Sequence, residues 1–339
     1  MRRMTKHAIL FAFIFSSLAA IGQDIHFSQF NSSPLLLNPA LAGVNGGTYR
    51  LVANYKAQWT QLAPYNTIAA SYDMNVFKHK TRANFGGIGA FFFTDKAGDS
   101  DLRTMQVNLN LSYTVILNRK GSQSITTGMM GGIGHRSINY SNLTFDSQFA
   151  GGFDPNLPTN ENFTTDKVLY PDIGAGILWN FVKSSKNLNF YAGSSVAHLN
   201  MPNLSFLNER DEQLYIKYTV HGGAHIGVSK QIFILPSFMY LNQGPHNQLN
   251  FGGLVKIRKS VMPGDRTAFY VGGWYRLKDA LILNVRVDIN NFNIGFSYDI
   301  NLSGLTPASS ANGGPELSLI YVGVFPEKKS QVKYCPPLL

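Results

Sequence analysis

Hydrophobic and polar residues alternate with a period of two along most of the chain after residue 48. The clearest example is the pair of segments 281–289 and 292–300, in which every second residue is apolar. A period of two places alternate side chains on opposite faces of a β-strand. If residues 290–291, Asn-Asn, form a two-residue turn, Val285 lies opposite Phe296 and both apolar sets share one face. These two segments are therefore predicted to form a β-hairpin.

The polar face of this hairpin carries three charged residues, Arg286, Asp288 and Asp299. A solvated sandwich face would carry mostly Ser and Thr. Each strand is about ten residues long, which is the length that a tilted strand needs to cross a bilayer. The hairpin is thus expected to face lipid on its apolar side and a hydrated lumen on its polar side.

The same alternation predicts about fourteen strands. They are residues 49–59, 66–77, 84–95, 102–118, 124–136, 170–181, 188–199, 214–229, 232–241, 248–258, 267–276, 280–289, 292–301 and 315–325. In 102–118, Gln106, Asn108 and Asn110 alternate with apolar residues, and such a row of amides suits a wet lumen better than a dry core. The fold class expected is all-β, a transmembrane antiparallel outer-membrane β-barrel with long external loops. Glycine-rich stretches at 86–89 and 128–134 are interpreted as strongly bent strands.

The connections between these strands differ in length and charge. Every second connection is short, and most of the others are longer, above all 137–169 and 200–213, as in barrels with short periplasmic turns and longer external loops. The short connections hold many of the basic residues: Lys78, Lys80, Arg82, Arg119, Lys120, Lys183, Lys186, Lys230, Lys259 and Arg266. Two interpretations stay open. Short polar turns attract lysine, or these cations contact anionic headgroups or a periplasmic partner.

Composition agrees with a β-rich membrane protein. The 339 residues are 44% hydrophobic, 13% aromatic and only 14% charged. The net charge of +10 would suggest a nucleic-acid partner if the cations formed one face, but they are spread over the turns, so no nucleic acid is expected.

The first 48 residues precede the strand pattern. Residues 1–22 combine basic residues with an apolar run of about thirteen residues and a small-residue cleavage site, which predicts an export signal. Residues 23–48 are apolar but contain Pro34 and Pro39, so we expect a short plug or flap in which Ser32 or Ser33 caps one helical turn. Either this segment packs at the near end of the barrel, or it plugs the lumen or presents a docking surface.

The expected domains are the signal peptide, residues 1–22; the plug or flap, 23–48; the barrel, 49–325; and a periplasmic tail, 326–339. The single Cys335 cannot form an internal disulfide. No catalytic, cofactor-binding or metal-binding residues are predicted. His221 and His225 share a strand face but lie about 13 Å apart, too far for a shared metal, and the acidic loop near Asp99 lacks the glycine and closing glutamate of a calcium loop.

Motifs at both ends of the mature chain resemble a known family. The residues concerned are His26-Phe27-Ser28-Gln29-Phe30, Leu37-Asn38-Pro39-Ala40, Ala42-Gly43, Asn54-Tyr55, Gln58-Trp59, Gly314, Glu316-Leu317-Ser318-Leu319 and Cys335-Pro336. The chain resembles the PorP/SprF family of outer-membrane proteins from the type IX secretion system of Bacteroidetes. Its ending, Pro337-Leu338-Leu339, departs from the usual basic or aromatic end of that family.

The resemblance implies a non-enzymatic barrel in the cell outer membrane. It would bind the C-terminal sorting domain of a secreted adhesin and hold it at the cell surface, or link other type IX secretion components to the periplasm. Exposed aromatic residues of the long loop and apolar residues of segment 23–48 are the candidate partner-binding residues: Phe145, Phe149, Phe153, Phe163, Phe27 and Phe30. A diffusion porin and an outer-membrane hydrolase are the alternatives.

Overall fold

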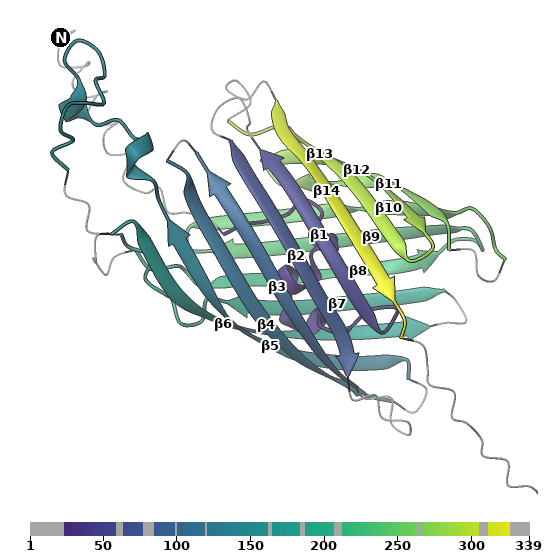
Figure 1. The fold of residues 1–339 in the computed structure, drawn as a ribbon. Coiled ribbons are helices and arrows are strands. Elements are labelled where there is room, and N and C mark those ends of the chain that lie inside the picture. The colour runs from purple at the N-terminus through teal and green to yellow at the C-terminus, as the bar shows by residue number, and fades with distance from the viewer. Residues whose placement is uncertain are drawn as a thin grey trace, which may run out of the picture.

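The computed structural model describes residues 24–58, 64–76, 85–98, 100–118, 121–161, 165–183, 187–206, 212–262, 266–304 and 311–325. The predicted signal peptide and C-terminal tail, Cys335 and Phe163 lie outside these residues. Among the described residues, fourteen strands form one closed antiparallel barrel (Figure 1). The strands are β1 (Tyr49–Gln58), β2 (Tyr65–Val76), β3 (Phe85–Ala97), β4 (Leu102–Ile116), β5 (Gln123–Ser137), β6 (Lys167–Lys183), β7 (Leu188–Ala197), β8 (Lys217–Gly227), β9 (Ile232–Gln243), β10 (His246–Arg258), β11 (Ala268–Arg276), β12 (Ala280–Ile289), β13 (Phe292–Asn301) and β14 (Asn312–Gly323).

Each strand pairs with its neighbours in sequence, and β1 pairs with β14 to close the barrel, with Tyr49 opposite Gly323. Closure leaves no unpaired sheet edge in the wall. No helix in the described part of the chain is both long and apolar enough to span a membrane. The predicted fold class is confirmed, because the described strands close into an antiparallel barrel of the expected size.

The β12–β13 hairpin has the predicted register, with Val285 opposite Phe296. Asn290 in its turn adopts a φ of 55°, which asparagine tolerates better than most residues. Leu283 is 51% exposed on the outer face, while the next residue, Asn284, is buried on the inner face. The apolar face thus points outward, as a lipid-facing surface requires.

The amide row of β4 also lies where the alternation placed it. Gln106, Asn108 and Asn110 are buried inside the barrel, whereas Leu109 and Leu111 between and beyond them are more than half exposed outside. The polar interior predicted from this strand is confirmed.

Strand lengths differ from the sequence-based bounds at several ends. β9 and β10 extend further than expected and leave only residues 244–245 between them, whereas the predicted strands leave residues 242–247. β6 starts earlier, at Lys167, because it continues to pair with β5 up to Ser137. Alternation weakens near strand ends, where both faces become polar, and so it does not fix these boundaries.

The core of the molecule lies inside the barrel and is formed with residues 24–48, which we call the plug. In Figure 1 the plug is the purple segment enclosed by the strands. It contains η1 (Phe30–Ser32), α2 (Pro34–Leu37) and η2 (Pro39–Leu41). Ser33 precedes the turn α2 as expected, but its side chain makes no capping hydrogen bond.

Two apolar clusters hold the plug on opposite sides. One joins Phe30 and Leu37 to Trp274 and its neighbours on β9 to β12, with the Phe30 and Trp274 rings edge to face at 5.7 Å. The other joins Phe27 and Leu35 to Phe91 and Phe93 on β3 and to β2. The remaining short helices, η3 (Tyr140–Asn142) and η4 (Asp146–Gln148), belong to the loop between β5 and β6.

Candidate functional site

The plug is tied to the wall by a carboxylate of β14. The backbone N–H groups of Ser28 and Gln29 donate to Oε2 and Oε1 of Glu316, at 2.7 and 2.9 Å. The Gln29 amide also donates to the Glu316 carbonyl oxygen and accepts from the Ser318 hydroxyl at 2.9 Å. All three of these side chains are buried. Because its carboxyl group accepts from two adjacent backbone N–H groups of the plug, Glu316 is a principal anchor of the plug.

A second anchor lies next to it. The Ser28 hydroxyl donates to Oδ2 of Asp299 at 2.6 Å and accepts from Nη2 of Arg276 at 2.8 Å, and Arg276 also pairs with Asp299 at 3.0 Å. Nζ of Lys56 donates to the His26 carbonyl oxygen at 3.2 Å. Asp299, which the sequence places on the polar face of the hairpin, therefore binds the plug through Ser28.

Asn38 fixes the middle of the plug. Its Oδ1 accepts from the N–H of Ala40, and its Nδ2 donates to the carbonyl oxygens of Ile177 on β6 and Ser194 on β7 at 3.0 and 3.2 Å. The same Nδ2 lies 3.1 Å from Nε2 of His221 on β8. One buried amide thus joins the plug to three adjacent strands.

Glycines of the wall leave room for this part of the plug. A Cβ on Gly128 would lie 2.4 Å from the Ala40 nitrogen, and one on Gly176 would lie 2.0 Å from Oδ1 of Asn38. A Cβ on Gly87 would lie 2.1 Å from the Ala42 carbonyl oxygen. These distances are too short for any side chain. Close approach of the plug, rather than strand bending alone, therefore explains the glycines at these positions.

The plug runs from one end of the barrel to the other. Gly43 lies at the end of the barrel that carries the short connections, such as the one between β2 and β3. There its N–H donates to Asp73 at 2.9 Å. Asp24 lies at the opposite end, where its carboxylate contacts Lys217 at the start of β8 and His198 just after β7. Because outer-membrane barrels have short periplasmic turns, we assign the Gly43 end to the periplasm and the Asp24 end to the exterior.

The contacts of Asp24 form an ion-pair cluster that we call the external latch. Nε2 of His198 lies 3.2 Å from Asp24, and its Nδ1 lies 2.9 Å from Asp172 on β6. Burial acts to raise the pKa of Asp24, but the charges of Lys217 and His198 outweigh burial and hold that pKa well below its ordinary value. Burial acts to lower the pKa of His198, but Asp24 and Asp172 outweigh it and raise that pKa. The latch therefore favours charged Asp24 and charged His198.

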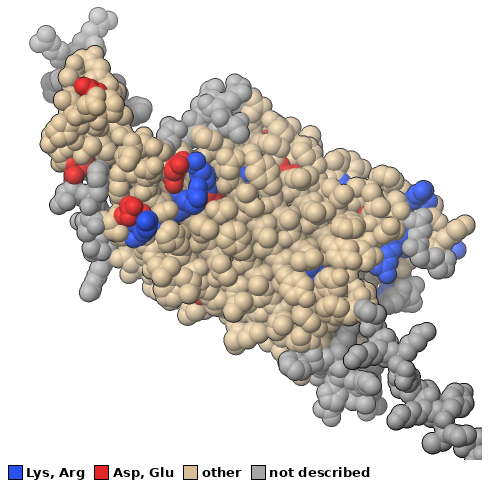
Figure 2. All heavy atoms as spheres, in the orientation of Figure 1, with Lys and Arg blue, Asp and Glu red and all other residues tan. Residues whose placement is uncertain are grey.

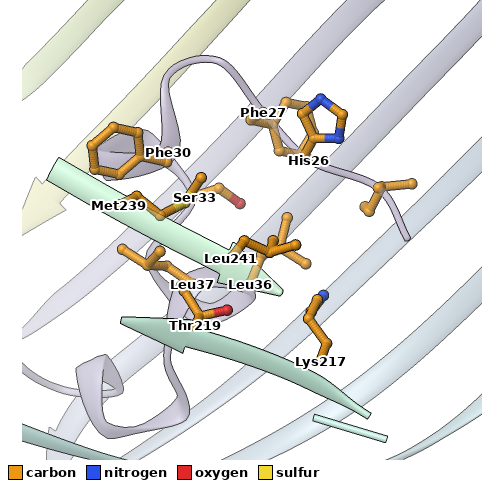
Figure 3. Close-up of a pocket in the computed structure, with 11 residues that line it drawn as sticks. His26, Phe27, Phe30, Ser33, Leu36, Leu37, Lys217, Thr219, Met239 and Leu241 are labelled. Atoms are coloured by element: carbon orange, nitrogen blue, oxygen red, sulfur yellow. The ribbon is translucent and has the colours of Figure 1, made fainter. Parts of the chain in front are cut away.

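Between the plug and strands β8 and β9 lies a small cavity of about 30 Å³. Figure 3 shows side chains of the plug, such as Phe27 and Leu37, and wall residues such as Met239 and Leu241 converging on it. Its lining is mostly apolar, with Lys217 on its edge. The cavity therefore has room for about one water molecule.

The candidate partner-binding residues fall into two groups. Phe149 and Phe153 lie in the loop between β5 and β6, 56% and 59% exposed, and their rings pack edge to face at 5.3 Å. Phe145 is half-buried in the same loop. Figure 1 shows this teal loop reaching away from the barrel. Phe27 and Phe30 instead lie buried in the plug, so their predicted role in partner binding would require the plug to move.

Sequence reasoning missed the residues that hold the plug, namely Glu316, Asn38 and Asp24. The available signal was the set of polar side chains, such as Asn38, inside an otherwise apolar segment. Among the described residues, no group of three or more His, Cys, Asp or Glu side chains is arranged to hold a metal ion. His221 contacts the plug through Asn38.

Several solved structures are similar to this chain in fold. The toluene transporter TbuX of Ralstonia pickettii is 12% identical, with a TM-score of 0.51, and the match covers 90% of this chain and 95% of that one. A Pseudomonas aeruginosa FadL homologue is 10% identical, with a TM-score of 0.47, covering 86% and 94% of the two chains. Among curated proteins, no sequence matches this chain significantly.

A closed barrel with an apolar exterior and a plug hydrogen-bonded to its polar interior defines an outer-membrane β-barrel protein. The family model for the type IX secretion system membrane protein PorP/SprF matches residues 19–321. The chain belongs to this family, and its place is the outer membrane.

Proposed function

We propose that this barrel binds the C-terminal sorting domain of a secreted surface protein, an adhesin, and anchors it at the cell surface. Family membership implies that other type IX secretion components are partners. The observation that supports the finer proposal is the exposed pair Phe149 and Phe153 on the long loop between β5 and β6. Paired aromatic side chains bury a large apolar area at low entropic cost, which makes them suitable anchors for a protein partner.

The plug argues against a diffusion porin. Its side chains are buried against opposite walls of the barrel, and its backbone is bonded to β14. An open porin needs a continuous aqueous channel. The basic periplasmic turns support a second candidate, a core secretion component that links the outer membrane to periplasmic partners.

Deleting residues 142–161 tests the first proposal. The barrel should still insert and stay non-conducting, while the adhesin is released into the medium. The double variant Phe149→Ser with Phe153→Ser should release adhesin in the same way, because it removes the apolar anchor but keeps the loop. Met201→Ser removes an exposed apolar side chain from a different external loop and is the matched control.

Adhesin that stays cell-bound in both loop variants would contradict the proposal. Increased conductance with adhesin retained would instead mean that the loop helps to close the lumen. Loss of another type IX function, such as secretion itself, would favour the linking component.

A further inference from the structure

Three cations face the lumen near its periplasmic end. They are Lys256 and Arg258 on β10 and Arg286 on β12. Their neighbours Val255 and Ile257 are 37% and 45% exposed on the outer face, so alternation directs the cations inward. We call these three residues, Lys256, Arg258 and Arg286, the basic mouth.

Aromatic rings lie beside all three cations, and the guanidinium carbon of Arg286 is 6.0 Å from the centroid of the Tyr270 ring. The guanidinium carbon of Arg258 lies 4.4 Å from the centroid of the Phe233 ring, which stacks on His225 at 4.9 Å and 14°. Nζ of Lys256 lies 4.9 Å from the centre of the Tyr270 ring. Such cation–π contacts order a cation without neutralising it. The basic mouth is therefore a preorganised group of charges.

Charge is not balanced in the basic mouth. Asp288 pairs with Lys256 at 3.3 Å and accepts from the Tyr270 hydroxyl at 2.5 Å. Within the described ranges, no carboxylate forms an ion pair with Arg258 or Arg286, although Arg286 donates to the Ser32 hydroxyl of the plug at 2.7 Å. Nε of Arg286 is buried without a hydrogen-bond partner in the same part of the structure. The three cations of the basic mouth thus share a single ion-paired carboxylate, Asp288.

Basic residues at the turns and strand ends around the basic mouth add to its positive charge. Lys183, Lys230, Lys259 and Arg266 are exposed at the same end of the barrel. Figure 2 shows Lys and Arg without neighbouring Asp or Glu at the right-hand end of the view, the end at which β14 finishes in Figure 1, whereas at the other end Lys and Arg lie beside Asp and Glu. A concave site lined by one sign of charge attracts the opposite charge strongly.

We propose that the basic mouth binds an acidic segment of a periplasmic polypeptide. The three cations face the lumen, so lipid headgroups around the barrel do not reach them as they reach the outer turns. Guanidinium groups pair with carboxylates through two hydrogen bonds, and a segment with several Asp or Glu residues would match several cations at once. This inference concerns the periplasmic end, and it goes beyond the adhesin binding proposed at the external loop.

Binding of fluorescent decaglutamate to the purified full-length barrel in neutral detergent tests the proposal, with decaglutamine as the neutral control. Decaglutamate should bind, and added salt should weaken it. The Arg258→Gln variant should weaken binding about tenfold, since it removes an unpaired cation, and Lys256→Gln together with Arg258→Gln should weaken it further. Lys183→Gln with Lys230→Gln removes two charges from the outer turns and should change the affinity less than about threefold.

Three results would overturn the proposal. The first is that the wild-type barrel does not bind decaglutamate. The second is that the two double variants weaken binding equally, which would indicate diffuse electrostatic attraction. The third is that Arg258→Gln lowers the preference of the barrel for phosphatidylglycerol over phosphatidylcholine nanodiscs, which would mean that Arg258 binds lipid headgroups. Each variant is first shown to be folded by a change in its gel mobility on boiling, which is expected because a closed barrel in detergent resists unfolding until it is heated. If the variant with both Lys256→Gln and Arg258→Gln does not fold, the single variant Arg258→Gln is compared with the wild type instead.

Discussion

The backbone N–H of Ser28 donates to Oε2 of Glu316 at 2.7 Å, across 288 positions of sequence. This contact joins the plug to the last strand of the barrel, which also closes the wall by pairing with β1. Closure of the barrel and placement of the plug therefore depend on the same strand. Removing the Glu316 carboxylate should loosen the plug without opening the wall.

The Glu316→Ala variant should have a higher single-channel conductance than the wild type. Two buried N–H groups, of Ser28 and Gln29, would lose their acceptor, at a cost of about 1–3 kcal/mol each. The wall keeps its backbone hydrogen bonds, so the gel shift on boiling should persist. Glu161→Ala, at an exposed loop position, is the control. Equal conductance of wild type and Glu316→Ala would mean that the apolar clusters alone hold the plug.

Replacing Gly128 by Val should displace the middle of the plug. A Cβ at this position would lie 2.4 Å from the backbone nitrogen of Ala40, whereas a Cβ on Gly131 of the same strand meets no atom within 4 Å. The Gly131→Val variant is thus a matched control. Planar-bilayer recordings should show openings for Gly128→Val and none for Gly131→Val. If neither variant shows openings, the close contact between Gly128 and Ala40 is not what keeps the plug in place.

Replacing Phe296 by Arg should impair insertion into the outer membrane. Phe296 is 46% exposed on the lipid face in the middle of β13, where a charge costs roughly 2–4 kcal/mol. Asn293→Arg on the lumen face of the same strand should be tolerated better. The measurement is the folded fraction in lipid vesicles by gel shift. Similar losses for both variants would contradict the assignment of the two faces.

The external latch should make plug stability depend on pH. The raised pKa of His198 stabilises the plugged state below the ordinary value of 6.5, and this contribution is lost as pH rises through the raised pKa. The lowered pKa of Asp24 contributes above its ordinary value of 3.8 and is lost only at much lower pH. The latch is thus strongest between these two values. Conductance events should become more frequent above pH 6.5, and the variant His198→Gln should lose this rise. An unchanged rise in that variant would assign the pH dependence to another group.

Much of the wall was predictable because strand alternation is a local property. The β12–β13 register, the outward face of Leu283 and the amide row of β4 all follow from a period of two with one lipid-facing side. The contacts between the plug and the barrel wall were harder to predict from the sequence. The plug was one of two open interpretations of residues 23–48, and its anchors on Glu316, Asp299 and His221 were not identified.

The sequence by itself determined the strands, their two faces and the family, because each strand needs only its own alternation and its neighbour to show which side meets lipid. The tertiary structure alone decided where the plug lies and which charges hold it. Ser28 and Glu316 meet only when the barrel closes, and nothing in the local pattern of either segment specifies that contact. The glycines at 87, 128 and 176 illustrate the same limit, because the atoms that forbid a side chain there belong to a distant segment.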